Sequence, residues 1–376
     1  MHEADQIHAT ALILDAHADT PQRFVDENWS FTGPLDDGMI NLATAQEGNL
    51  AAEFFAIWVD PTEFPPGTQS DRAFQLIDGV LAQVRSAPEA LALCRTPAEI
   101  LVARKAGKFA IVLAVEGGHA IEDNLEILRT YHQLGVRYMT LTWSHTTTWA
   151  DSSGDGGHHN GLTDFGKQVI REMNRLGMMV DVSHVSDKTL EDVLATSTAP
   201  IIASHSSARA LTGAPRNLTD DQIRAIAATG GAVMVNFFPA FIDETWRAAW
   251  SALKPERDLA HQAAAAPYRL NGDPVPFAVS NAIDREFAAR LERPPLSSLL
   301  DHIEHILRVA GEDHIGIGSD FDGIPATPAE IDTAADLIKI TRGLYDRGIT
   351  AEQLHKLLGG NLLRVFQSIQ DHATHG

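Results

Sequence analysis

Cysteine is almost absent from this chain of 376 residues, and basic residues are few. The one cysteine, Cys94, leaves no partner for an internal disulfide and excludes a Cys-rich zinc site. It lies in the apolar segment Ala90–Arg95, where a buried structural thiol is more typical than a nucleophile. The 29 Lys and Arg residues face 50 Asp and Glu residues, which gives a formal charge of −21. Such a surface repels phosphates, so we expect neither a nucleic acid partner nor binding to anionic membranes.

Long hydrophobic runs and a basic leader are also missing. The start of the chain, Met1–Gln6, has no basic stretch followed by an apolar core, so we expect no signal peptide. No apolar run is long enough to span a bilayer. With 44% hydrophobic and 21% charged residues, the composition is that of a globular enzyme. We therefore expect a cytoplasmic protein whose residues 1–376 form a single domain.

Eight apolar or β-branched runs predict strands. Most are continuous rather than alternating, which is the pattern of parallel strands buried on both faces. The eight runs are Ala11–Ala16, Leu50–Val59, Phe109–Val115, Val136–Thr142, Met178–Val182, Pro200–Ala203, Ala232–Phe237 and His314–Gly318.

Segments with helical periodicity lie between most of these strands. Thr163–Leu176, for example, starts at a capping threonine and ends before Gly177. Strands that alternate with helices predict a (β/α)₈ TIM barrel, and a doubly wound open sheet is the alternative. The other predicted helices are Asp71–Arg85, Pro97–Ala106, Asn124–Leu134, Ser186–Ala195, Thr219–Ala228, Ser297–Ala310, Ile331–Arg347 and Thr350–Gln367.

Two segments interrupt this alternation. Asp60–Ser70 is proline-rich and predicts a surface loop. Residues 239–295 form a long insertion between the seventh and eighth strands. Insertions of that length often cover an active site, and extra surface helices are an equally good interpretation.

Metal-type side chains stand at the ends of five of the predicted strands. Enzymes built on parallel sheets gather their chemistry at the carboxyl ends of the strands. His17 and Asp19 follow the first strand and, at positions i and i+2, face the same way. Glu116 follows six apolar residues, where a carboxylate is costly unless it is paired or metal-bound. A salt bridge at the start of a loop is the alternative for Glu116.

Two consecutive strands end in the same dipeptide, Ser-His. A single histidine after a strand is more often a structural residue than a ligand, but His184 and His205 repeat the arrangement. Neutral imidazole and carboxylate together form a ligand set that suits zinc and other divalent ions. The pattern therefore indicates a hydrolytic metal centre.

Three further side chains are candidates for catalysis or substrate binding. Asp320, after the eighth strand, is placed to take a proton from a metal-bound water and pass it to a leaving amine. Asp322 is more typical of a turn cap. Arg216 offers a guanidinium fork that can hold a carboxylate, although a single arginine is ordinarily just exposed.

Taken together, eight segments make the chain resemble the membrane dipeptidase (renal dipeptidase) family of zinc peptidases, family M19, of amidohydrolase type. Their joint occurrence in this order, between about Leu14 and Asn361, is highly specific. The segments are Asp15–Pro21, Ala114–Gly118, Gly135–Thr142, Trp149–Ser152, Val180–His184, Ile202–Ser206, Pro215–Leu218 and Gly318–Gly323.

The resemblance implies a barrel with two zinc ions per chain. It implies that one ion is held by His17, Asp19 and Glu116, and the other by Glu116, His184 and His205. It further implies that Asp320 is the proton shuttle and that Arg216 binds the terminal carboxylate of the substrate. Relatives of this kind are often dimers, so a homodimer is expected from the resemblance alone.

One position departs from the family pattern. The family usually has a histidine directly after the Leu-Thr of the fourth strand, where it polarises the scissile carbonyl and stabilises the tetrahedral intermediate. Here that position is Trp143, and the nearest histidine is His145. Either His145 takes over the role of catalysis and substrate binding, or the role is lost or moved.

Our hypothesis is a zinc dipeptidase in which a hydroxide bridging two ions attacks the peptide bond of L-Xaa-L-Xaa or L-Xaa-D-Xaa dipeptides. One alternative is a hydrolase of another small amide, such as an N-acyl amino acid or a lactam. A second alternative is a metal-binding relative without catalysis.

Overall fold

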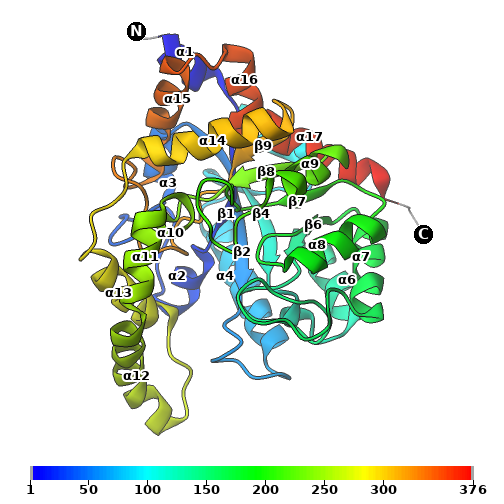
Figure 1. Cartoon of the computed structure of the whole chain (residues 1–376), viewed down its shortest axis with the longest axis vertical. Coiled ribbons are helices and arrows are strands. Elements are labelled where there is room, and N and C mark those ends of the chain that lie inside the picture. Colours follow the sequence, from blue (N-terminus) through cyan, green and yellow to red (C-terminus); the bar gives the residue numbers. More distant parts are fainter. Residues whose placement is uncertain (1–2, 374–376) are drawn as a thin grey trace.

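The computed structural model describes residues 3–373 and shows a barrel of eight parallel strands (Figure 1). The strands pair in the order β2-β1-β9-β8-β7-β6-β5-β4, and β2 also pairs with β4. The barrel strands are β1 (Ile13–Ala18), β2 (Leu50–Trp58), β4 (Phe109–Glu116), β5 (Val136–Thr140), β6 (Met179–Asp181), β7 (Ile201–Ala203), β8 (Ala232–Val235) and β9 (Ile315–Ile317).

Closure of the barrel depends on the pairing between β2 and β4. These two strands pair in register over seven residues, from Ala52–Ala110 to Trp58–Glu116. The predicted (β/α)₈ barrel is thereby confirmed, and the open-sheet alternative is wrong. A ninth strand that the sequence did not indicate, β3 (Leu91–Leu93), pairs with β4 outside the barrel.

Helices surround the barrel, and the barrel strands are buried on both faces as the continuous apolar runs predict. The surrounding helices are α4 (Gln69–Ser86), α5 (Pro97–Lys105), α6 (Leu125–Leu134), α7 (Asp164–Leu176), α8 (Asp187–Thr196), α9 (Asp220–Ala228), α14 (Leu296–Ala310) and α15 (Leu337–Asp346). The capping of α7 is as predicted: the Thr163 side chain accepts from Gly166 N, and Gly177 is left-handed.

The carboxy-terminal segment closes the amino-terminal end of the barrel. Phe366 of α17 (Asn361–His372) packs on the barrel interior, with its ring centroid 6.0 Å from that of Phe54. The single helix predicted over residues 350–367 is divided into α16 (Ala351–His355), a π turn at Lys356–Gly360, and α17. The division follows from Gly359, whose φ of 173° is not helical.

Three short helices were not predicted, because each spans eight residues or fewer and carries little periodicity. They are α1 (Glu3–Thr10), α2 (Pro21–Asp26) and α3 (Leu42–Glu47). The helix predicted from Ile331 instead begins at Leu337, after a 3₁₀ turn at Ala334–Asp336. Within residues 3–373, no helix combines the length and the apolar character that a membrane crossing requires.

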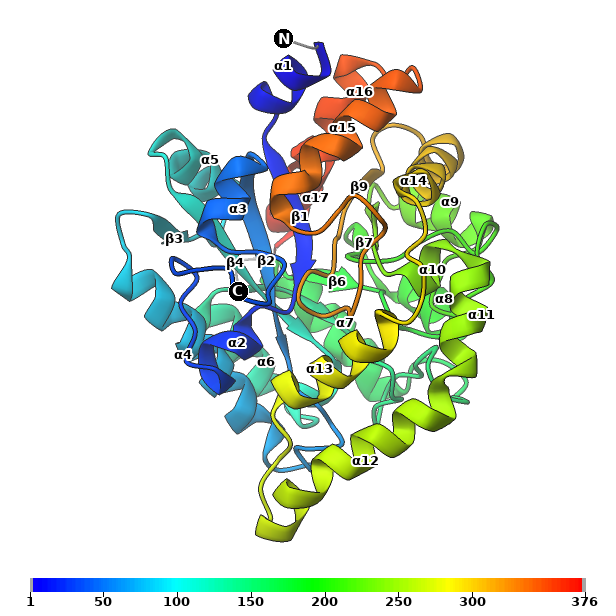
Figure 2. The ribbon, with the colours of Figure 1, turned by 90° about the vertical axis from the view of Figure 1, so that its left-hand side faces the viewer.

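The insertion at residues 239–295 is helical and stands beside the carboxyl ends of the strands (Figure 2). Its last helix packs against α2, whereas α12 projects away from the barrel (Figures 1 and 2). The helices are α10 (Pro239–Ile242), α11 (Glu244–Ala252), α12 (Lys254–Asn271) and α13 (Phe277–Ala288).

At the carboxyl end, Gly318 allows the loop after β9 to approach the loop after β7. A Cβ at Gly318 would lie 1.9 Å from the carbonyl oxygen of Ser204. This contact sets the spacing between Asp320 and His205, which follow these two positions in the chain.

We expect Gly318→Ala to lower the free energy of unfolding by about 1–3 kcal/mol or more, because the added methyl group forces the two loops apart. Gly156→Ala is the control, since a Cβ at Gly156 meets no atom within 4 Å. Urea unfolding of both variants measures the effect. Equal unfolding midpoints would show that the close approach is not a constraint.

Candidate metal centre

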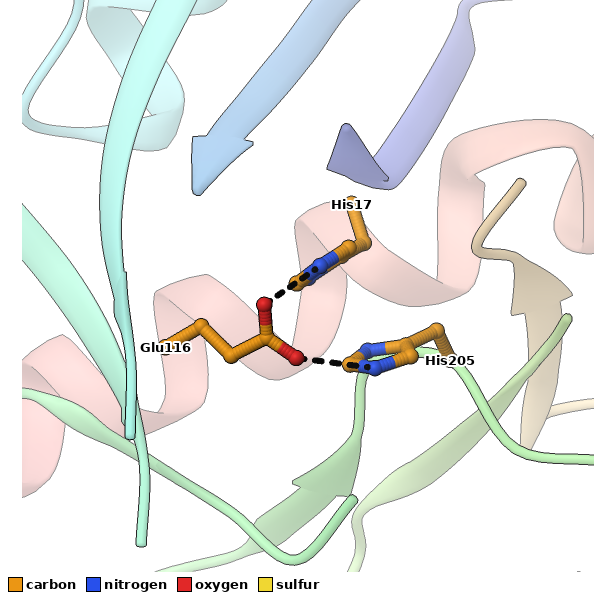
Figure 3. Close-up of side chains that lie close together, drawn as sticks. All are labelled: His17, Glu116 and His205. Atoms are coloured by element: carbon orange, nitrogen blue, oxygen red, sulfur yellow. Dashed lines mark ion pairs between the residues drawn. The ribbon is translucent and has the colours of Figure 1, made fainter. Parts of the chain in front are cut away.

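Glu116, the last residue of β4, lies beside His17 of β1 and beside His184 and His205, which follow β6 and β7. Figure 3 shows Glu116 between His17 and His205. Oε2 of Glu116 is 3.5 Å from Nε2 of His17. Its Oε1 is 2.9 Å from Nε2 of His184 and 3.4 Å from Nε2 of His205. The two carboxylate oxygens therefore face two different groups of nitrogen ligands. Asp19 adds an oxygen 3.6 Å from His17 Nε2.

These separations can be compared with those around a metal ion. Zinc binds imidazole nitrogen and carboxylate oxygen at about 2.0–2.2 Å, so ligand atoms of a tetrahedral site lie roughly 3.3 Å apart. The distances from Glu116 to His17 and His205 are close to that value. Two groups of three side chains bring one ligand atom each to within 4.8 Å of one another: His17, Glu116 and His205, and His17, Asp19 and Asp320.

The hydrogen bonds of His17 leave its Nε2 free to bind an ion. Nδ1 lies 2.7 Å from the hydroxyl of Tyr138, and that hydroxyl donates to the carbonyl oxygen of Ala16 at 2.9 Å. The hydroxyl has one proton and uses it in the hydrogen bond to Ala16. In the hydrogen bond to Tyr138, Nδ1 of His17 must therefore be the donor. A histidine protonated at Nδ1 carries its lone pair on Nε2, which is the form that binds metals.

His205 is oriented in the same way by two residues. Its Nδ1 is 2.7 Å from Oγ of Ser204, and that hydroxyl donates to Oδ2 of Asp181 at 2.6 Å. The lone pair of His205 is therefore also on Nε2, facing Glu116. Such support of a ligand by a carboxylate behind it is usual in metal sites.

Two buried polar atoms at the centre have no hydrogen-bond partner within the described part of the chain: Nε2 of His17 and Oδ1 of Asp19. Buried polar atoms are seldom left unpaired, because each costs free energy. Both atoms have lone pairs and point into the cluster. The residues present therefore fit divalent metal ions with nitrogen and oxygen ligands.

The backbone is strained at two of the site residues. His184 has a φ of 69° and Asp320 a φ of 65°, both in the left-handed region. That conformation costs a non-glycine residue on the order of 1–3 kcal/mol and is found most often at functional sites. The strain turns both side chains back over the mouth of the barrel.

Burial keeps His184 and His205, two of the three histidines beside Glu116, neutral. The pKa of the third, His17, is raised, because Tyr138 and Glu116 outweigh the effect of its burial. Desolvation, with the positive charge of Arg216 adding to it, lowers the pKa of His184 to about 4. Burial and neighbouring positive charges lower the pKa of His205 as well. Neutral imidazoles are ligands rather than ion-pair partners, which again favours a metal centre.

Asp320 is held by a residue that the sequence analysis missed. Nδ2 of Asn236 donates to Oδ2 of Asp320 at 2.8 Å, and Oδ1 of Asn236 accepts from Phe238 N. The signal was present, since Asn236 is the only polar residue in the predicted strand Ala232–Phe237. Burial and the charges of Asp19 and Glu116 raise the pKa of Asp320 from 3.8 to about 8.

Arg216 lies behind His205. It donates from Nη1 to Oγ of Ser206 at 2.8 Å and from Nη2 to the carbonyl oxygen of His205 at 2.9 Å. Its Nε is buried and has no partner in the described residues. Burial lowers the pKa of Arg216 to about 10, which leaves it cationic at neutral pH.

The structure places two other predicted residues away from the ligands. His145 is exposed and packs on Trp143, with ring centroids 5.4 Å apart; among residues 3–373, no hydrogen bond or ion pair joins it to a predicted ligand. Its role stays a prediction. Asp322 accepts from Thr20 Oγ1 at 2.8 Å and from Met39 N at 2.7 Å, so it ties the loop after β9 to two earlier segments.

Comparison with known proteins gives a family and several solved relatives. A family model described as membrane dipeptidase (peptidase family M19) matches residues 1–375. The probable dipeptidase PvdM from Pseudomonas aeruginosa is 28% identical, with a TM-score of 0.81 and 98% of each chain covered. The dipeptidase AC, a metallo peptidase of family M19, is 27% identical, with a TM-score of 0.78, 96% of this chain and 99% of that chain covered.

A third solved relative holds a ligand. It is a metallo peptidase from Rhodobacter sphaeroides, liganded with a phosphinate mimic of the dipeptide L-Ala-D-Ala. It is 26% identical, with a TM-score of 0.78, and the match covers 96% of this chain and 99% of that chain.

Tyr138→Phe should weaken zinc binding by about 10–100-fold, because it removes the hydroxyl that orients His17. Tyr131→Phe is the matched control: Tyr131 is equally buried, and its hydroxyl donates to Ala120 O at 2.7 Å away from the ligands. Competition with a chromophoric chelator measures the affinity. If both variants bind zinc like the parent chain, the hydroxyl does not orient the ligand.

The raised pKa of Asp320 also predicts how the stability of the chelator-treated chain depends on pH. Between about pH 4 and pH 8 the unfolded chain has an ionised Asp320, whereas the folded chain keeps the proton. Unfolding then releases a proton, so the free energy of unfolding falls as the pH rises, by at most about 1.4 kcal/mol per pH unit.

Urea unfolding at several pH values tests this dependence. Asp320→Asn should flatten it. Asp221→Asn, which removes a carboxylate whose side chain is 96% exposed, should leave it unchanged. A slope that is the same in both variants would rule out Asp320 as its source.

Proposed function

The chain belongs to the membrane dipeptidase family and is a metal-dependent peptide-bond hydrolase, and we propose that it holds two zinc ions and cleaves dipeptides with a free terminal carboxylate. The observation that carries the proposal is the position of Glu116, with one carboxylate oxygen toward His17 and the other toward His184 and His205. A carboxylate so placed can bridge two ions. Asp19 completes the ligands on the His17 side.

Bound zinc supplies Lewis acidity, which polarises the scissile carbonyl and lowers the pKa of water. The chain itself supplies the proton transfer. Asp320 has one oxygen fixed by Asn236, and a Cβ at Gly323 would lie 2.4 Å from its other oxygen and 2.0 Å from Oδ2 of Asp19. This second oxygen therefore faces the ligand cluster. Bound metal cations would favour the ionised form of Asp320, which could then accept a proton from water and donate it to the leaving amine.

Arg216 is the group that selects short substrates. Ser206 and the backbone of His205 hold its guanidinium in place. Little further side-chain entropy is therefore lost when a substrate binds to Arg216. Its unpartnered Nε can bind a carboxylate oxygen. Because a protein chain has no α-carboxylate next to its internal peptide bonds, this arrangement favours dipeptides.

We propose that the carboxy-terminal residue can have either the L or the D configuration. The Rhodobacter sphaeroides relative, which is liganded with a mimic of L-Ala-D-Ala, supports acceptance of a D residue. N-acyl amino acids and lactams are the competing small amides, and a direct comparison of substrates separates them from dipeptides.

The test is a panel of L-Xaa-L-Xaa and L-Xaa-D-Xaa dipeptides with zinc-loaded protein, with N-acyl amino acids measured in parallel. We expect two zinc ions per chain, turnover of dipeptides, and loss of that turnover in chelator with recovery on added zinc. Asp320→Asn should retain zinc and lower kcat by at least about 100-fold. Turnover of N-acyl amino acids alone would refute the dipeptidase assignment.

Arg216→Ala tests the carboxylate role. It should lower kcat/KM for dipeptides by about 100-fold, because a buried charged hydrogen-bond partner is lost. For the matching dipeptide amides, which have no carboxylate, kcat/KM should change little. Arg209→Ala is the control, since Arg209 is in the same segment but pairs with Asp187 on the surface. An equal loss on dipeptides and their amides would rule out recognition of the carboxylate.

A further inference from the structure

A cavity of about 800 Å³ lies between the mouth of the barrel and the insertion. The barrel side is lined by Trp58, Trp143 and Gly323, and the insertion contributes Phe277 from α13 and residues of α12. Cavities that hold small molecules usually measure about 300–1,000 Å³. The space is therefore large enough for a whole amino-acid residue.

The cavity reaches the metal centre at two points. On one side, Gly323 lies against the ligand cluster, since a Cβ there would be 2.0 Å from Asp19 Oδ2. On the other side, the Trp143 ring centroid is 6.5 Å from that of His184. The cavity therefore lies next to the metal centre.

Three aromatic rings form one face of the cavity, which we call the aromatic wall: Trp143, Trp58 and Phe277. The ring centroids of Trp58 and Trp143 are 4.8 Å apart, and those of Trp58 and Phe277 are 5.7 Å apart. The rings come from the loop after β5, from the end of β2 and from α13, so the insertion completes the wall. Aromatic faces at these spacings offer edge and face contacts to a further ring.

The charges around the cavity indicate which end of a dipeptide enters it. Four acidic residues and two arginines line the space. Both arginines are already paired, Arg72 with Asp26 at 2.8 Å and Arg269 with Glu63 at 2.5 Å. Asp284 pairs with Arg257 at 3.2 Å, so within residues 3–373 Asp60 is the lining carboxylate without an ion pair. The lining therefore has a negative excess that attracts an ammonium group and repels a carboxylate.

The cation proposed to bind the terminal carboxylate is elsewhere. Arg216 does not line the cavity, and its guanidinium carbon lies 5.6 Å from the ring centroid of Phe241 in α10. The two ends of a dipeptide thus meet opposite charges at different places. With the carboxylate at Arg216, the amino-terminal residue is the one that reaches the cavity.

We propose that the cavity binds the amino-terminal residue of the dipeptide and that the aromatic wall selects a large aromatic side chain there. This inference rests on the proposed function and adds the class of substrate. Burial of a phenyl ring against the wall stabilises the complex through the hydrophobic effect and ring contacts.

The test compares four dipeptides in which only one position carries a side chain: L-Phe-Gly, L-Ala-Gly, Gly-L-Phe and Gly-L-Ala. We expect kcat/KM to be at least about tenfold higher for L-Phe-Gly than for L-Ala-Gly, which corresponds to about 1.4 kcal/mol. The ratio of Gly-L-Phe to Gly-L-Ala should stay below about threefold. A preference at the carboxy-terminal position, or at neither position, overturns the proposal.

Variants assign the preference to the wall. Phe277→Ala and Trp143→Ala should each reduce the L-Phe-Gly to L-Ala-Gly ratio toward one. Tyr268→Ala is the control, because Tyr268 is a half-buried aromatic residue of the same insertion that does not line the cavity. Phe277→Leu keeps an apolar side chain of similar volume, so it is less prone to a folding defect than Phe277→Ala. It should give an L-Phe-Gly to L-Ala-Gly ratio between those of the parent chain and Phe277→Ala. Unchanged ratios in all wall variants would overturn the proposal.

A binding measurement separates this inference from the proposed function. Phosphinate mimics of L-Phe-Gly and L-Ala-Gly are titrated calorimetrically into the zinc-loaded protein. If no dipeptide is hydrolysed but the Phe mimic binds at least tenfold more tightly, the dipeptidase assignment fails and the cavity assignment stands. If dipeptides are hydrolysed and the two mimics bind equally, the reverse holds.

Discussion

The Glu116 carboxylate is the charge around which the mouth of the barrel is organised. Only 3% of this residue is exposed, and a buried carboxylate is costly unless positive charge or hydrogen-bond donors surround it. His184 and His205 touch it, yet burial lowers the pKa of both, so they do not supply that charge at neutral pH. His17 is different, because Tyr138 and Glu116 raise its pKa although it is buried. Metal cations between Glu116 and the imidazoles would take the place of the proton on His17, and the unpartnered Nε2 of His17 and Oδ1 of Asp19 fit this arrangement.

The barrel holds the side chains around Glu116 in fixed positions. Two of the three histidines are oriented from behind: the Tyr138 hydroxyl of β5 holds His17, and Asp181 of β6, through Ser204, holds His205. Left-handed backbone at His184 and Asp320 turns their side chains over the same opening. Because these restraints come from a closed sheet, the ligands are pre-positioned rather than gathered by the ion.

The surroundings of the centre have opposite charge on its two sides. Arg216 supplies a fixed cation behind His205, whereas the cavity under the insertion has a negative excess and an aromatic wall. A dipeptide has the same polarity, with a carboxylate at one end and an ammonium at the other. Trp143 is central to this arrangement: it stands where the family resemblance expects a histidine, and its ring joins the wall while His145 remains exposed.

The sequence by itself determined the barrel class, its eight strands and the set of candidate ligand residues. These follow from local patterns, since continuous apolar runs mark strands buried on both faces, and residues such as Glu116 or His205 stand at their ends. Only the tertiary structure decided the closure through β2 and β4, the partners Tyr138 and Asn236, and the cavity beneath the insertion. Each of these features joins segments that are far apart in the chain. The periodicity of a local segment does not predict which distant segment it will contact.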